Sequence, residues 1–239
     1  MSRILSGLFV VFLLSAEGLS ASEAANSAIH FSTAIISPYQ MYSQDGELGG
    51  FAIPLVGCAM AQLGRTYKID VLPWARAQKN VELGESDAFF VASRNDARDA
   101  YAQQSAPLFS GSRSWFFRTG LELDPQSNEF RENAMVGTVF GTNMHRLLME
   151  THRNVITKTT EKELISLLEI GRLDGLFLTD LMFDHSLTSL GLEPLDFVKK
   201  ESVQQPLGVY FGNHFLARNP SFLGGFNHAI SECRSGGTL

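Results

Sequence analysis

Short apolar runs alternate with amphipathic segments along most of the chain, and this pattern predicts the order of its elements. Strands are expected at residues 29–36, 67–72, 87–92, 134–140, 155–159, 173–178 and 206–211. Helices are expected at residues 52–63, 74–83, 96–101, 143–152, 161–170, 181–190 and from 219 to about 234. Apolar strands that alternate with amphipathic helices are typical of α/β folds with a parallel sheet covered on both faces.

One stretch of the chain occurs twice in similar form. Residues 81–90 read VELGESDAFF and residues 168–177 read LEIGRLDGLF, so each copy ends an amphipathic run at a glycine and places an aspartate three residues later. Glycine can adopt the left-handed conformation that closes a helix, and the apolar run that follows indicates a buried strand. The copies lie 87 residues apart. Two copies at so long a period do not suit a solenoid and predict two similar lobes.

Two segments are expected to cross between these lobes, at residues 112–119 and 203–210, and so to form a two-strand hinge. The predicted division is residues 25–112 with 206–239 for the first lobe and 113–205 for the second. Ligands of such sheets bind beyond the carboxyl ends of the strands, where helix N-termini present free N–H groups.

Residues 1–24 are expected to be a signal peptide. Arg3 precedes an apolar run at residues 5–14, and small residues follow at 20–25. A run this short does not span a membrane, since a spanning helix needs about 20 residues. We therefore expect export to the periplasm, with cleavage near Ser22 or Ala24.

The composition favours a globular protein, with 44% hydrophobic and 18% charged residues among 239. Without residues 1–24 the chain keeps 18 Lys and Arg against 23 Asp and Glu, a net charge of −5. That sign argues against nucleic acid or an anionic membrane surface as the main partner. No spacing typical of a metal site or of a bound cofactor occurs, so none is expected.

The two cysteines, Cys58 and Cys233, leave two alternatives open. In an oxidising compartment they could form a disulfide between an early helix and the last one, closing a very long loop. They could equally be two buried thiols that pack as small hydrophobic side chains.

Several short motifs together resemble one known family. They are PY at 38–39, DGELGGF at 45–51, LGESDA at 83–88, SRNDAR at 93–98, VGT at 136–138, GT at 141–142, LDG at 173–175 and GVYF at 208–211. In order and spacing the chain resembles family 3 of the bacterial extracellular solute-binding proteins, the polar amino acid binding group. The resemblance spans nearly the whole chain after residue 24, and it implies the two-lobed type 2 periplasmic binding fold.

The resemblance implies that the segment from Ser93 to Arg98 holds the carboxylate of a ligand, with Arg98 as the clamp and the Ser93 hydroxyl assisting. A guanidinium presents paired donors in a fixed fork that match a carboxylate. From residue type alone, Arg98 could instead be an exposed arginine in a surface cluster with Asp96 and Asp99.

Aromatic and basic side chains near the strand ends are further candidates for the first lobe. Tyr39 follows the first expected strand and Trp74 the second, so both are expected on the wall of the cleft, where an aromatic face can stack on a ligand. Aromatic residues also belong to the core more often than to a site. Arg76 could point into the cleft or pair with a surface carboxylate.

The second lobe is expected to contribute Thr142 and Asn143, at a helix start whose free N–H groups could complete an anion site. Thr142 could also be the cap of that helix. Relatives that bind amino acids usually place an aspartate after the LDG strand, where this chain has Thr179 with Asp180 one residue on. A shift of one residue turns a strand side chain to the other face, so Asp180 need not take that role.

The favoured hypothesis is a monomeric periplasmic protein that captures an amino acid or a related small carboxylate for an inner-membrane ABC importer. A second hypothesis is a sensory or accessory module that signals to a membrane partner. A third is a dehydratase-like enzyme, for which Asp180, Asp184, His185 and His145 are the candidate acids and bases. No nucleophile elbow or phosphate loop supports catalysis, so we expect no enzyme.

Overall fold

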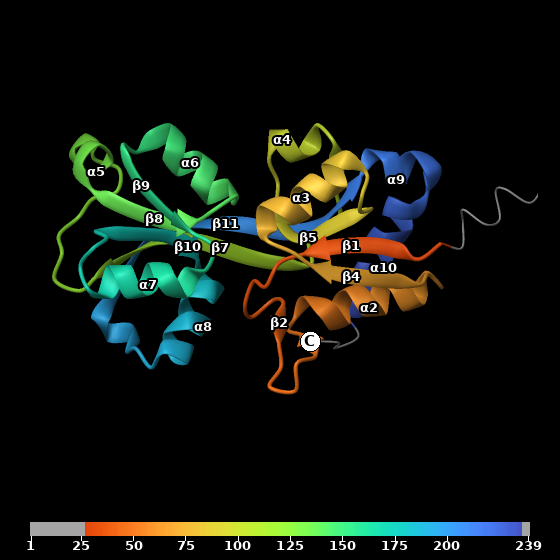
Figure 1. Cartoon of the computed structure of the whole chain (residues 1–239), viewed down its shortest axis with the longest axis horizontal. Helices are drawn as coiled ribbons and strands as arrows, with labels where there is room; N and C mark the ends of the chain where they lie inside the picture. Colours follow the sequence, from red (N-terminus) through yellow and green to blue (C-terminus); the bar gives the residue numbers. More distant parts are fainter. Residues whose placement is uncertain (1–26, 236–239) are drawn as a thin grey trace, which may run out of the picture.

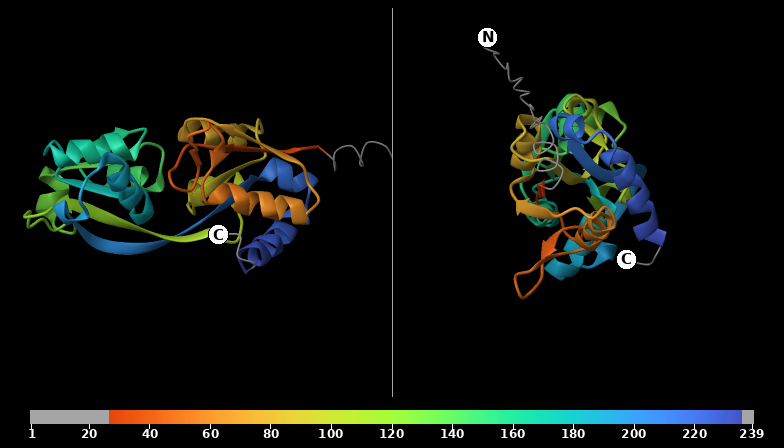
Figure 2. Two further views of the ribbon diagram at one scale, coloured as in Figure 1. Left: turned by 90° about the horizontal axis from the view of Figure 1, so that it is seen from below. Right: turned by 90° about the vertical axis from the view of Figure 1, so that its right-hand side faces the viewer.

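The structure is a computed structural model and describes residues 27–235. The expected signal peptide therefore lies outside the described residues. Helices and strands form two groups, and two long strands run from one group to the other (Figure 1). Figure 2 shows these strands, β7 (Phe109–Arg118) and β11 (Phe197–Gly212), side by side along one edge of the molecule.

The first lobe is built from segments near both ends of the described chain. Its strands are β1 (Ile29–Thr33), β4 (Tyr67–Val71), β5 (Ala88–Ser93) and β6 (Ala102–Gln104), beside a small hairpin of β2 (Met41–Tyr42) and β3 (Leu48–Gly49). Its helices are α2 (Ala52–Gln62), α3 (Trp74–Leu83), α4 (Asp96–Asp99), α9 (Asn213–Arg218) and α10 (Phe222–Ser235).

The second lobe is built from the middle of the chain. Its strands are β8 (Met135–Val139), β9 (Asn154–Lys158) and β10 (Gly175–Thr179). Its helices are α5 (Asn128–Asn133), α6 (Asn143–Thr151), α7 (Glu161–Glu169) and α8 (Asp180–Leu190), and a short 3-10 helix, η1 (Pro194–Asp196), precedes β11.

A single sheet passes through both lobes in the order β4-β1-β5-β11-β7-β10-β8-β9, with β6 paired to β11. The outer pairs β1–β4, β1–β5, β8–β9 and β8–β10 are parallel. The pairs made by β7 and β11 are antiparallel. Parallel strands near both ends of the sheet place their carboxyl ends toward the space between the lobes, where a ligand site is expected.

The repeated motif has the same structural role in both lobes. Gly84 ends α3 in the left-handed conformation, and Gly171 has a positive φ after α7. Asp87 accepts a hydrogen bond from the backbone N–H of His30 at 2.9 Å, and Asp174 accepts one from the N–H of Met135 at 2.7 Å. In each lobe the aspartate therefore fixes the start of the neighbouring parallel strand.

Several predicted boundaries were wrong, and the largest error concerns β11. The expected strand at 206–211 continues back to Phe197, through polar residues that pair with β7. The expected strand at 29–36 ends at Thr33, and the next residues leave the sheet. Strands β6 and β7 and helices α5 and α9 were not predicted as such, because short or polar elements leave weak periodic signals.

A disulfide joins Cys58 in α2 to Cys233 in α10, with an S–S distance of 1.98 Å. It lies next to the aromatic core of the first lobe, where Phe31 packs edge-on against Phe90 and Phe211. The bond therefore ties a helix near the start of the described chain to the last one, which is the first of the two alternatives that the sequence left open.

Within residues 27–235, none of the helices is long and apolar enough to cross a membrane. The same residues contain no group of three or more His, Cys, Asp or Glu side chains placed to hold a metal ion.

Candidate functional site

A cavity of about 620 Å³ lies between the two lobes. Its walls come from segments that follow the carboxyl ends of β1, β4 and β5 in the first lobe and of β8, β9 and β10 in the second. Most of the lining is apolar, including Ile36, Leu72, Val91, Met144, Met182 and Leu207. A solute with a substantial apolar body fits such walls, and a few polar groups would then orient it.

Arg98 lies in this lining although it belongs to α4, and its side chain is only 3% exposed. Its Nε donates to Gln78 Oε1 at 2.9 Å and its Nη1 donates to the carbonyl of Ser93 at 2.6 Å. The guanidinium also lies over the ring of Trp74, 5.5 Å from its centroid. These contacts hold the guanidinium in one place beside the cavity.

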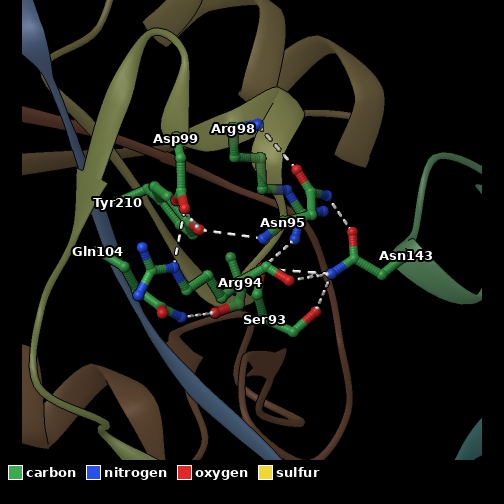
Figure 3. Close-up of polar contacts among 9 residues, drawn as sticks. Ser93, Arg94, Asn95, Arg98, Asp99, Gln104, Asn143 and Tyr210 are labelled. Atoms are coloured by element: carbon green, nitrogen blue, oxygen red, sulfur yellow. Dashed lines mark hydrogen bonds and ion pairs between the residues drawn. The ribbon is translucent and has the colours of Figure 1, made fainter.

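No carboxylate among the described residues forms an ion pair with Arg98, and its Nη2 has no hydrogen-bond partner there. The neighbouring Asp99 pairs instead with Arg94, at 2.8 Å (Figure 3). Burial lowers the pKa of Arg98 to about 10, so the group is still charged at neutral pH. A buried cation without a counter-ion is costly, and an anionic ligand group would relieve that cost.

Ser93 and Asn143 line the cavity and also contact each other across the lobes. Asn143 Nδ2 donates to Ser93 Oγ at 2.6 Å and to the carbonyl of Arg94 at 2.9 Å (Figure 3). Asn95 donates to the Oδ1 atom of Asn143, and Gln78 donates to the carbonyl of Gly141 at 3.2 Å. The two predicted ligand residues are therefore part of a polar contact that holds the lobes together.

Removal of that contact should loosen closure. We expect Asn143→Ala to weaken ligand affinity by about 5- to 10-fold, because each lost hydrogen bond contributes roughly 0.5–1.5 kcal/mol. X-ray scattering of the unliganded variant should show a larger radius of gyration than wild type. Thr151→Ala, at the far end of the same helix, is the control. An unchanged radius and affinity in Asn143→Ala would contradict a latch at this place.

The aromatic candidates both lie in the lining. Tyr39 is 2% exposed and packs on Phe109, and burial, with the nearby Asp180 charge, raises its pKa to about 12. The indole Nε1 of Trp74 is buried without a hydrogen-bond partner among the described residues. Trp74 therefore presents both a ring beside the Arg98 cation and an unused donor.

Arg76 lies outside the cavity lining. Its guanidinium pairs with Glu85 at 3.5 Å, and both side chains are at least half exposed. Of the two alternatives for Arg76, the structure has the surface pair, and a contact with a ligand stays a prediction. On α3 it lies two residues from Trp74, and that spacing turns it away from the face that Trp74 shares with the cavity.

Thr142 lines the cavity and caps α6, because its hydroxyl accepts from the N–H of His145 at 3.1 Å. Thr179 also lines the cavity, and its Oγ1 is buried with no partner among the described residues. Both second-lobe threonines thus lie where a ligand would contact them, but the Thr142 hydroxyl already accepts the hydrogen bond that caps α6.

Asp180 is absent from the cavity lining, and it is the first residue of α8 and not part of β10. Its Oδ2 accepts from Ser112 Oγ at 2.6 Å and from Lys199 Nζ at 3.1 Å, on the two hinge strands. Burial alone would raise its pKa, but hydrogen bonds from Ser112 and Lys199, with the Lys199 charge, hold the pKa of Asp180 below its usual 3.8. In this structure Asp180 therefore binds the two hinge strands, and the Asp180→Asn variant tests whether it also contacts a ligand.

Asp180→Asn should lower stability and leave ligand affinity unchanged. We expect a loss of roughly 1–2 kcal/mol in the free energy of unfolding at neutral pH, the range of a hydrogen bond to a charged group. A carboxyl with a lowered pKa in the folded state stabilises above its unfolded pKa, and this contribution disappears as the pH falls through the lowered value. Urea unfolding of both proteins should thus differ at neutral pH and converge only as the pH falls through the lowered pKa of Asp180. A loss of ligand affinity in Asp180→Asn would show that Asp180 contributes to the binding site.

Two further residues of the site were missed. Gln78 connects Arg98 to the second lobe, and a glutamine within a helix gives no sequence signal for such a role. Glu161 was not among the candidates, because the sequence TEKE at 160–163 is typical of a helix start; in the structure Thr160 makes no capping bond to the backbone and donates to Glu163 at 2.9 Å. Glu161 is 7% exposed and lines the cavity.

The candidate acids and bases for catalysis lie elsewhere. Asp180, Asp184, His185 and His145 are absent from the lining of the 620 Å³ cavity. His145 borders a smaller cavity of about 220 Å³, which Arg98, Thr142 and Asn143 also line. Burial raises the pKa of Asp184 and lowers that of His145.

Comparison with known proteins rests on structure, because no family model and no curated protein matches the sequence. An ancestral arginine-binding protein bound to arginine superimposes with a TM-score of 0.74 at 17% identity, over 88% of this chain and 94% of that one. A histidine kinase sensor domain with similarity to periplasmic binding proteins reaches 0.77 at 17% identity, over 89% and 92%.

A third similar structure is the arginine-, lysine-, histidine-binding protein ArtJ from Geobacillus stearothermophilus, with a TM-score of 0.73 at 15% identity, over 88% of this chain and 91% of that one. The chain has a two-lobed periplasmic binding protein fold. The predicted fold class is thereby confirmed. At these identities the likeness concerns the fold, and membership of family 3 stays a prediction.

Proposed function

We propose that the chain is a periplasmic solute-binding protein that encloses a small carboxylate-bearing solute, an amino acid or a related molecule, between its lobes. The observation that carries this proposal is Arg98, a buried guanidinium that has no counter-ion within residues 27–235 and lies beside a cavity that both lobes line. A ligand carboxylate would take the free Nη2 donor and supply the missing negative charge.

Closure of the lobes follows from the same arrangement. We place the hinge where β7 and β11 cross between the lobes, and the lobes at residues 25–112 with 206–239 and at 113–205. A ligand held by groups from both lobes gains all its contacts only in the closed state, so it shifts the population toward closure. Delivery of the solute to an inner-membrane ABC importer is the role that we propose for the closed, monomeric form.

A sensory role is the second candidate, and the specific support for it is the likeness to a histidine kinase sensor domain, at a TM-score of 0.77. The same cavity and hinge would then report the ligand to a membrane partner. Binding and closure are common to both roles, so the first experiment addresses binding.

The test is a titration of the purified mature chain with a panel of amino acids, opines and small carboxylates. Tryptophan fluorescence should respond, since Trp74 lines the cavity, and the melting temperature should rise with ligand concentration. If no member of the panel changes either signal, the proposal fails.

A further inference from the structure

The cavity contains a second charged group that a simple carboxylate would not use. Glu161 is the first residue of α7 and is 7% exposed, and it borders the same cavity as Arg98 from the opposite lobe. Its Oε1 accepts from Ser186 Oγ at 3.0 Å. Among the described residues, its Oε2 has no hydrogen-bond partner and no cation forms an ion pair with it.

A purely structural role does not account for this carboxylate. A glutamine would accept the same bond from Ser186 without the cost of a buried charge. Its place at the start of α7 offsets part of that cost through the helix dipole, but leaves Oε2 without a donor. A cationic or donor group of a ligand would satisfy it.

The two charges of the cavity are separate. Arg98 and Glu161 form no ion pair, and Glu161 is not among the groups that shift the pKa of Arg98. Apolar side chains make up most of the remaining wall. In addition, Thr179 offers only a hydroxyl beside the cavity, so no carboxylate from that position is available for an ammonium next to the ligand's carboxylate.

From these contacts we infer that the cavity takes an ω-amino carboxylate, with its carboxylate on Arg98, its ammonium on Glu161 and an apolar chain between them. This inference rests on the proposed function and specifies its ligand class. The ligand would neutralise both unpaired groups at once, and each pole would contact a different lobe, so binding would also favour closure.

The experiment compares matched ligands on the wild-type protein by calorimetry. ω-Aminobutyrate, ω-aminopentanoate and ω-aminohexanoate are each set against the alkanoate with the same number of carbons. At least one ω-amino acid should bind roughly 10-fold or more tightly than its alkanoate, in the range of one hydrogen bond to a charged group. If alkanoates bind and the ω-amine adds nothing at any length, this inference fails and the proposed function stands. If no carboxylate binds, both fail.

Two variants test whether Glu161 is the source of the preference for ω-amino acids. Glu161→Gln keeps the acceptor for Ser186 and removes the charge, so it should abolish the preference for the ω-amino acid over the alkanoate of equal length. Ser186→Ala removes the structural bond alone and should keep the preference. A preference that survives in Glu161→Gln would overturn the inference, and the wild-type comparison decides the matter even if a variant does not fold.

Discussion

Arg98→Ala should abolish most of the affinity for a carboxylate ligand while the protein remains folded. Loss of one partner from a buried, hydrogen-bonded charge pair costs about 2–5 kcal/mol, which corresponds to roughly 30-fold to several-thousand-fold in the dissociation constant. The expectation depends on the burial of Arg98 and on the absence of a counter-ion among the described residues. Calorimetry with the tightest carboxylate of the panel measures it.

Arg94→Ala is the matched control, because Arg94 belongs to the same segment but is exposed and pairs with Asp99. An exposed pair contributes about 0–1 kcal/mol, so this variant should bind like wild type. Arg98→Lys keeps the charge without the planar fork and should fall between the two. Equal affinities of Arg98→Ala and wild type for the carboxylate would show that Arg98 does not bind the ligand.

Loss of the disulfide should give the largest change in stability. The bond closes a loop with a sequence separation of 175 residues. A cross-link of this kind stabilises mainly by restricting the unfolded chain, and its removal from a folded protein costs roughly 2–5 kcal/mol. For a chain of this size we expect the Cys58→Ala Cys233→Ala variant to melt about 5–15 °C lower.

The double variant also removes packing, since Cys233 in α10 is only 2% exposed and belongs to the hydrophobic core. Wild type under a strong reductant separates the two contributions, because it keeps both side chains. It should lose most of the same stability as the double variant. A reduced protein that melts at the oxidised temperature would mean that the bond contributes little.

Strongly periodic elements could be predicted from the sequence alone. Helix α3 has its predicted limits, Trp74 and Leu83, because apolar spacing and Gly84 both mark them. The hinge strand β11 could not be delimited in this way. Its first half is polar and satisfies its backbone by pairing with β7, which lies far away in the sequence.

The site was harder to predict than the fold. Motif resemblance singled out Arg98, but its burial, and the absence of a counter-ion for it in the part of the chain that the structure describes, are properties of the packed lobes. The sequence around Glu161 is typical of a helix start, and this pattern gives no indication that the side chain lies on the cavity wall. Asp180 begins helix α8, directly after the last residue of β10, and its bonds to Ser112 and Lys199 involve segments that the sequence does not place beside it.

The central claim is that Arg98 holds an anionic group of the ligand, and a double-mutant cycle tests it most directly. The tightest carboxylate of the panel and its primary amide are each titrated into wild type and Arg98→Ala. The carboxylate should lose at least about 1.5 kcal/mol more than the amide on removal of the guanidinium, the lower range for a charge-assisted bond. Equal losses for the two ligands would show that Arg98 does not bind the carboxylate, and would contradict the account.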